Sequence, residues 1–226
     1  VMSLETCYGP ELNVYEETPE HAKRLVTSTP VLSHKKLQSI LKNKYFSCEE
    51  FNLEYSSDKK LLNALKDLQK KVVKSVKNGK VIIHLVEKLP KADSLSINAL
   101  LAVGCIHQEL VKLGLRSEAN IVVTSSSARD THQIACLIGF GATAVYPTLA
   151  YQTILDLSHR NELQGSPHSN CARYRKGINK GLLKIISKMG ISTISSYRGS
   201  QLFEVVGLNK DLSLIHISEP TRRITI

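Results

Sequence analysis

The sequence is poor in aromatic residues and lacks long apolar runs. It has no tryptophan, and aromatic residues make up 5% of its 226 residues, which excludes an aromatic-rich binding surface. No apolar run reaches the roughly 18 residues that a membrane span needs. The opening residues, Val1 to Glu5, lack the basic and then apolar layout of a secretory signal. Such an opening indicates a segment taken from a longer protein.

The cysteines are also too irregular to form a disulfide framework. The five cysteines stand at positions 7, 48, 105, 136 and 171, and no two of them form a Cys-x-x-Cys pair. An odd number at wide, uneven spacing disfavours a secreted disulfide-bonded domain and favours buried thiols in a reducing cytosol or organelle matrix. We therefore expect a cytoplasmic protein.

The charge balance is basic. Lys and Arg number 30 against 20 Asp and Glu, which gives a formal net charge of +10. This excess is compatible with nucleic acid, an anionic substrate or an acidic partner, but a solvated lysine-rich face explains it as well and is the favoured interpretation. The length suits one domain, or one domain and part of another.

The pattern of apolar residues becomes regular from Asp58 onward. Residues 1–57 read as irregular chain with short helices, one of them capped by Ser33. Asp58 is expected to cap a long helix with a leucine and valine stripe on one side and lysines on the other. Strands are predicted at 81–86, 119–124, 142–146 and 191–195, and the helices between and after them at 96–113, 129–138, 149–157, 174–189 and 199–205.

This alternation predicts an α/β fold with a parallel sheet, right-handed crossovers and flanking helices. Four such units fit either an open doubly wound sheet or part of a (β/α)₈ barrel, and periodicity alone does not separate the two. In both architectures the loops after the strands hold the ligand site.

That rule directs attention to the loop from Ser125 to His132. Its hydroxyl groups, backbone amides and Arg129 side chain could hold a phosphate or carboxylate. In the structural alternative, which we favour, Ser127 or Asp130 caps the next helix and Arg129 pairs with a neighbouring acid. The candidate site residues are therefore Ser127, Arg129, Asp130 and His132. A nucleophile–base–orienter array is disfavoured, because such partners usually come from separate segments.

A metal site in this region has weak support. His132 and Cys136 are four residues apart on a predicted helix, a spacing that suits two metal ligands. No third ligand shows comparable placement. Cys105 and Cys136 stand among aliphatic residues and resemble small core side chains, so we expect no metal.

The helix predicted at 174–189 is the most distinctive segment. Four lysines at steps of four residues form one cationic ridge, and Gly177 and Gly181 indicate close packing against another element. The apolar side is expected to be Ile178, Leu182, Ile185 and Met189. A ridge from Lys176 to Lys188 could bind nucleic acid or an acidic partner. A solvated face or a contact with an acidic neighbouring domain is favoured, because no nucleic-acid-binding motif accompanies the ridge.

Several of these segments resemble the large subunit of glutamate synthase. The similarity is strongest over 174–190 and its continuation to Leu208, and over 128–130, 139–147 and 149–151. Residues 29–32 and 116–123 are similar as well. The resemblance is collinear over about residues 1–211. It is looser at 124–126 and 131–133, which leaves a ligand role for that loop unsupported.

The resemblance implies the central domain, an incomplete barrel-like α/β unit between the amidotransferase and flavin sites that helps to shape the path of ammonia. The parent converts glutamine, 2-oxoglutarate and reductant to two glutamates. It is expected to contain FMN and an iron–sulfur cluster, with no cofactor in this fragment. No catalytic, cofactor-binding or metal-binding residue carries over to this sequence, so the fragment alone should be inactive. Its expected partners are the other domains of the same subunit and a small reductase subunit.

The resemblance also divides the chain. Residues 1–57 are expected to lead into the central domain, and residues 58–211 to form it. Residues 212–226 resemble a translated sequencing adapter and are interpreted as a non-native tail. A small stand-alone barrel enzyme with an anion at Ser125 to Arg129 ranks last, because only four strands are convincing.

Overall fold

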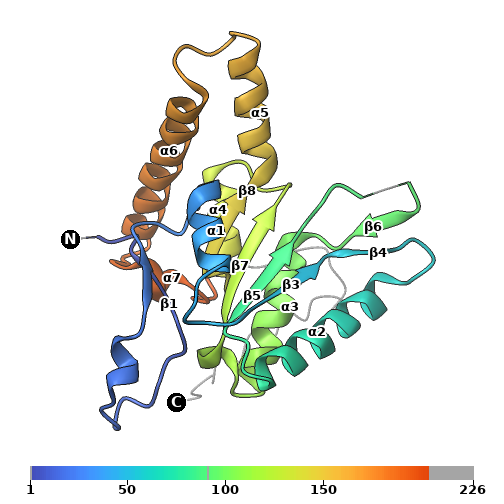
Figure 1. The fold of residues 1–226 in the computed structure, drawn as a ribbon, viewed down its shortest axis with the longest axis vertical. Helices are drawn as coiled ribbons and strands as arrows, with labels where there is room; N and C mark the ends of the chain where they lie inside the picture. Colours follow the sequence, from blue (N-terminus) through green and yellow to red (C-terminus); the bar gives the residue numbers. More distant parts are fainter. Residues whose placement is uncertain (1, 91, 204–226) are drawn as a thin grey trace, which may run out of the picture.

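The computed structural model describes residues 2–90 and 92–203, and its centre is a four-stranded parallel sheet (Figure 1). The strands lie side by side in the order in which they occur along the chain. A doubly wound sheet reverses its order at a switch point, whereas a (β/α)₈ barrel does not. The fold is therefore α/β with a partial, barrel-like sheet. The strands are β3 (Cys48–Asn52), β5 (Ile82–Val86), β7 (Asn120–Ser125) and β8 (Ala144–Pro147).

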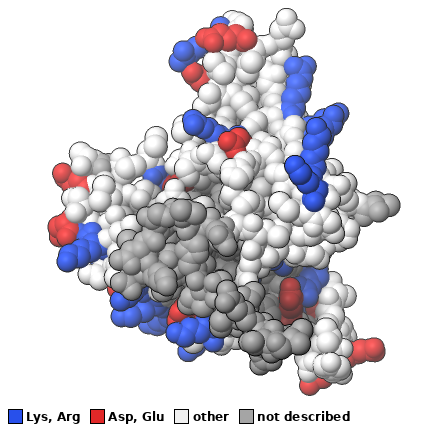
Figure 2. All heavy atoms as spheres, turned by 180° about the vertical axis from the view of Figure 1, so that it is seen from behind, with Lys and Arg blue, Asp and Glu red and all other residues white. Residues whose placement is uncertain are grey.

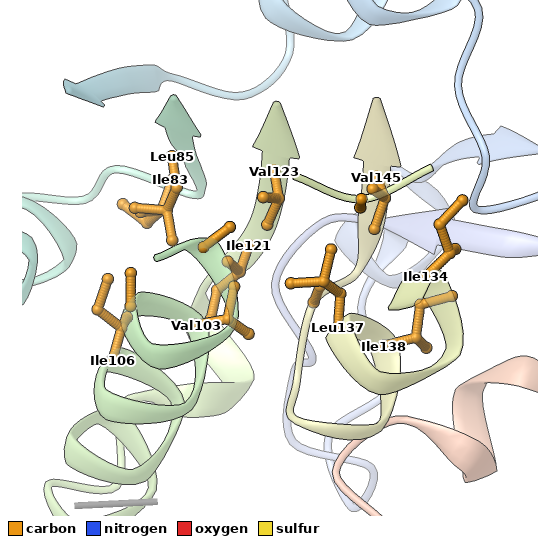
Figure 3. Packing of buried hydrophobic residues seen from close by; sticks show 14 of the residues in the cluster. Ile83, Leu85, Val103, Ile106, Ile121, Val123, Ile134, Leu137, Ile138 and Val145 are labelled. Atoms are coloured by element: carbon orange, nitrogen blue, oxygen red, sulfur yellow. The ribbon is translucent and has the colours of Figure 1, made fainter. Parts of the chain in front are cut away.

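The register of the strands sorts their side chains onto two faces. Ile83 is opposite Ile121, and Val123 is opposite Val145, so these residues share one face of the sheet. Figure 3 shows this outer face packed against helical side chains such as Val103 and Leu137. Continuous apolar runs suit strands that are buried on both faces. The covering helices are α2 (Leu61–Lys77), α3 (Ala99–Lys112) and α4 (Thr131–Gly139).

The inner face of the sheet is covered by the N-terminal segment. Leu37 and Ile40 of α1 (His34–Leu41) join Tyr8 in a buried cluster over Ile82 and Val122. As expected, Ser33 caps α1 by accepting a hydrogen bond from the Lys36 amide at 3.3 Å. Residues 30–32 also pair with the free edge of β8, where the Val145 amide donates to the Pro30 carbonyl at 2.8 Å. The space that a closed barrel would enclose is therefore filled by this chain itself.

A helical hairpin rises beyond the sheet (Figure 1). It consists of α5 (Thr148–His159) and α6 (Pro167–Lys188), and α6 begins seven residues before the predicted start at 174, with Ser166 as its cap. Ile178, Leu182 and Ile186 form its buried side, whereas Met189 is 46% exposed, contrary to expectation. The remaining elements are β1 (Thr6–Tyr8), β2 (Leu25–Thr27), β4 (Glu54–Ser56), β6 (Ser94–Ser96), α7 (Ile194–Tyr197) and the 3₁₀ helices Pro19–Ala22 and Arg116–Glu118.

Two predicted strand assignments are wrong. Residues 48–52 were expected to be irregular or helical but form β3, which pairs with β5 in parallel. Residues 191–195 do not form a strand, because Thr193 makes only an isolated bridge with Ser3 and its hydroxyl caps α7. No helix forms at 199–203, the described part of the helix predicted at 199–205. The tail at 212–226 lies outside the described residues.

Besides the start of α6, two more predicted helix starts are wrong. The helix predicted from 96 begins at Ala99 with Asn98 as its cap, since residues 94–96 pair with β4. Asp58 does not cap α2, because the N-cap position is Lys60 and the Asp58 carboxylate accepts a hydrogen bond from Ser56 instead.

Candidate functional site

The loop between β7 and α4 forms the carboxyl-edge site, which surrounds a carboxylate of the chain itself. Glu87 follows β5 directly, and its Oε2 atom accepts hydrogen bonds from Ser125 Oγ at 2.6 Å and Ser127 Oγ at 2.8 Å. The amides of Ser126 and Ser127 each donate to the same oxygen at 3.0 Å. The Ala99 amide donates to Oε1 at 3.0 Å. The donors that made this loop a candidate for binding a phosphate or carboxylate are therefore directed to Glu87 of the chain itself.

Glu87 is buried and charged. The residue is 5% exposed, and burial by itself would raise the pKa of its carboxyl group. The hydrogen bonds from Ser125, Ser127 and Ala99 outweigh burial and hold the pKa of Glu87 below its ordinary value of 4.5. Hydrogen bonds to a charged group contribute about 1.5–3 kcal/mol each. The loop and the end of β5 are thus fixed to each other by an internal charge.

The four predicted site residues have different environments. Ser127 binds Glu87, whereas Asp130 caps α4 by accepting from the Gln133 amide at 2.8 Å. Arg129 and His132 are exposed. Among the described residues Arg129 is in no ion pair, so its expected partner acid is not found there. The fold therefore does not bring the four side chains together around one ligand.

Ser127 and His132 do line a common hollow. It has a volume of about 220 Å³ and also contains Cys136. The Ser127 hydroxyl is directed to Glu87, and Cys136 Sγ lies 3.6 Å from His132 Nε2. Burial raises the pKa of the Cys136 thiol, which leaves it a poor nucleophile. Within residues 2–90 and 92–203, no three His, Cys, Asp or Glu side chains are grouped to hold a metal ion.

A second polar cluster, on the inner face of the sheet, was missed by sequence reasoning. His84 Nε2 lies 2.8 Å from Thr124 Oγ1, and Glu50 Oε2 lies 3.3 Å from His84 Nδ1. This hydroxyl–imidazole–carboxylate order is that of a catalytic triad. However, Thr124 is 9% exposed, and the contact at Nδ1 lacks hydrogen-bond geometry. Burial also lowers the pKa of His84. The cluster joins β3, β5 and β7, and its buried hydroxyl is poorly placed to meet a substrate.

A larger cavity, of about 600 Å³, opens at the amino ends of the strands, beside Asn120 and Thr143. Its two arginines are already engaged. Arg198 lies 3.8 Å from Glu11, and Arg24 donates to the Gly9 carbonyl at 3.1 Å. In barrel folds this end of the sheet contributes to stability, whereas ligands bind at the opposite end.

These features define the class of the molecule. It is an α/β unit with a barrel-like parallel sheet, and the loop after β7 surrounds the side chain of its own Glu87. Over residues 1–209 the chain matches the family described as "Glutamate synthase central domain". The chain belongs to this family. The similarity covers both the sheet and the hairpin, and it gives no support to the nucleic-acid alternative.

The most similar relatives include glutamate synthases from bacteria, plants and yeast. The chain is 35% identical over 214 residues to the glutamate synthase [NADPH] large chain of Bacillus subtilis, covering 94% of this chain and 14% of the relative. It is 37% identical over 229 residues to the chloroplastic ferredoxin-dependent glutamate synthase of Oryza sativa, with the same two coverages. The Saccharomyces cerevisiae glutamate synthase [NADH] is 31% identical over 244 residues. The chain thus spans about one seventh of the length of the first two relatives.

The solved structures that it resembles include the flavin-binding domain of baker's yeast flavocytochrome b2. The TM-score is 0.49 at 14% identity, covering 85% of this chain and 45% of that one. This similarity is too low to support an inference about function. In the part of the chain that the structure describes, every helix is too short or too polar to cross a membrane.

Proposed function

We propose that this chain is the structural central segment of a glutamate synthase large subunit and contains neither of its reaction centres. The parent enzyme would convert glutamine, 2-oxoglutarate and reductant to two glutamates in the cytoplasm. The carboxyl-edge site carries the proposal, because the loop that holds ligands in other parallel α/β folds is filled here by Glu87.

The inner face of the sheet supports the same role. The N-terminal segment covers it, so Tyr8, Leu37 and Ile40 pack where the remaining strands of a complete barrel would lie. A unit filled on both faces provides rigid walls for its neighbours. In this proposal FMN, the iron–sulfur cluster and the amidotransferase nucleophile belong to other parts of the parent. The neighbours are the other domains of the subunit and a small reductase subunit. The same proposal treats residues 1–57 as the lead-in to the central domain and residues 58–211 as the domain itself.

The test is to purify the chain and the full-length parent in parallel. We expect a folded chain by circular dichroism that shows no flavin absorbance and no glutaminase activity, beside a parent that shows both. A yellow chain with stoichiometric flavin would refute the proposal, and so would glutaminase activity that co-purifies with the chain.

A further inference from the structure

A basic groove lies between α6 and the segment that leads into α1. Its volume is about 380 Å³, and Thr29 Oγ1 on one wall donates a hydrogen bond to Asn179 Oδ1 on the other at 2.6 Å. No Asp or Glu from residues 2–90 or 92–203 lines the groove. Its cations are Lys36 from α1 and Arg175, Lys176 and Lys180 from α6, and its uncharged polar residues are Ser28, Thr29, Ser33 and Asn179.

The four cations of the basic groove have no ion-pair partner among the described residues. Lys36 Nζ donates to Ser28 Oγ at 3.2 Å, and the Arg175 guanidinium lies 5.9 Å from the centre of the Tyr151 ring. Both contacts leave the positive charge uncompensated. Like charges that line one groove repel each other, and carboxylates placed between them would turn this repulsion into attraction.

The basic surface continues beyond the groove. Lys184 and Lys188 are exposed on α6, and Figure 2 shows Lys and Arg side chains following this helix along one edge of the molecule. Gly177 is exposed on the same helix, and a Cβ atom added there would meet nothing within 4 Å. Glycine inside a helix costs about 1 kcal/mol relative to alanine. The described chain gives no packing reason for this cost, whereas a partner backbone lying close to α6 would give one.

The available partner is the remainder of the polypeptide. The match to the Bacillus subtilis relative covers 94% of this chain but 14% of the relative. Most of the parent would therefore lie outside this segment. We infer that the basic groove docks an acidic segment, rich in Asp and Glu, from another part of the same parent polypeptide. This inference rests on the proposed function, because a scaffold between two catalytic domains must hold both of them in place.

The direct test uses the full-length parent and a carbodiimide, which joins a lysine amine to a carboxylate only when the two are in contact. Mass spectrometry should find Lys176 or Lys180 linked to an Asp or Glu outside residues 1–211. Acetylation of these two lysines should also be several-fold slower in the parent than in this chain alone. Equal acetylation in both, without such links, would overturn the inference.

The matched control lies on α2. Lys66 and Lys70 have the same four-residue spacing as Lys176 and Lys180, and they are exposed as well. Acetylation of Lys66 and Lys70 should proceed equally in the parent and in the chain. In the parent, the double variant Lys176→Gln/Lys180→Gln should lose the links, whereas Lys66→Gln/Lys70→Gln should keep them.

Two further arms separate this inference from its competitors. If a single-stranded oligonucleotide protects Lys176 and Lys180 from acetylation while the rest of the parent does not, the groove binds nucleic acid and the inference is wrong. Flavin in the isolated chain would instead refute the proposed function, whatever the links show. If the isolated chain contains no flavin and the parent gives no cross-links, the docking inference is wrong while the proposed function stands.

Discussion

The carboxyl-edge site and the basic groove both present donors to an anion, but among the described residues only the first has a carboxylate that accepts from them. At the edge of the sheet, two hydroxyl groups and three amides converge on Glu87. In the groove, four cations face no acid among the described residues. Similar clusters of donors therefore serve opposite purposes, one closing the fold and the other leaving a surface available. The difference depends on whether the fold brings a carboxylate to the cluster.

The contrast between the two sites fails if Glu87 contributes nothing to the stability of the chain, and this test has the largest expected effect. Glu87→Ala leaves buried hydroxyl and amide donors without an acceptor, so we expect the free energy of unfolding to fall by about 3 kcal/mol or more. Denaturant unfolding measures this change. The control is Glu162→Ala on the exposed hairpin loop, which should stay within about 0.5 kcal/mol of the original chain. Equal stability of the two variants would contradict the role given to Glu87.

The two glycines of α6 extend the comparison to packing. A Cβ atom at Gly181 would lie 2.5 Å from the stiff side chain of Thr131, next to the carboxyl-edge site. Gly181→Ala should therefore destabilise the chain by about 1–3 kcal/mol. Gly177→Ala, on the open side, should stabilise it by about 0.5–1 kcal/mol. Thermal unfolding of both variants measures the difference, and a loss of stability in Gly177→Ala would show an intrachain contact at that position.

The pH dependence of stability gives a smaller effect with a defined sign. Because the folded pKa of Glu87 lies below its ordinary value, its contribution is complete above about 4.5 and is lost as pH falls through the folded pKa. The stability difference between the original chain and Glu87→Gln should shrink below pH 4.5. Burial and the charge of Arg116 lower the pKa of His107 to about 4, and this histidine affects both proteins equally. Unfolding midpoints on both sides of pH 4.5 measure the effect, and a difference that grows in acid would be incompatible with a lowered pKa.

The smallest effect is expected in the basic groove. Lys176→Gln/Lys180→Gln removes two charges that have no ion-pair partner among the described residues, so the unfolding free energy of the isolated chain should change by no more than about 0.5 kcal/mol. The same denaturant experiment measures it. A loss comparable to that of Glu87→Ala would mean that these lysines already have acidic partners within the chain.

The regular part of the fold was predictable from sequence. Three buried strands were placed within two residues of their observed bounds, because each is a short, largely apolar run that follows a helix and a glycine-bearing turn. The strand β3 was missed, since only Phe51 of its five residues is buried and its charged residues conceal the alternation. The predicted strand at 191–195 failed for the opposite reason, because β-branched residues there cap and begin a short helix.

The carboxyl-edge site was predictable only in part. The sequence indicated that donors gather in the loop after β7, but not that Glu87, 38 residues before Ser125, would occupy it. One signal was available, because Glu87 directly follows a predicted strand, and the carboxyl ends of neighbouring parallel strands share one edge. The glycines of α6 show the same limit. Gly181 packs closely as expected, whereas Gly177 does not, and spacing alone could not distinguish them.

The most direct test of the account is a titration of FMN with the purified chain, in which quenching of flavin fluorescence reports binding. If Glu87 fills the carboxyl-edge site, quenching should show no saturable component. Saturable binding of one FMN per chain, lost in Ser127→Ala, would place a reaction centre in this segment and contradict its proposed role as a scaffold.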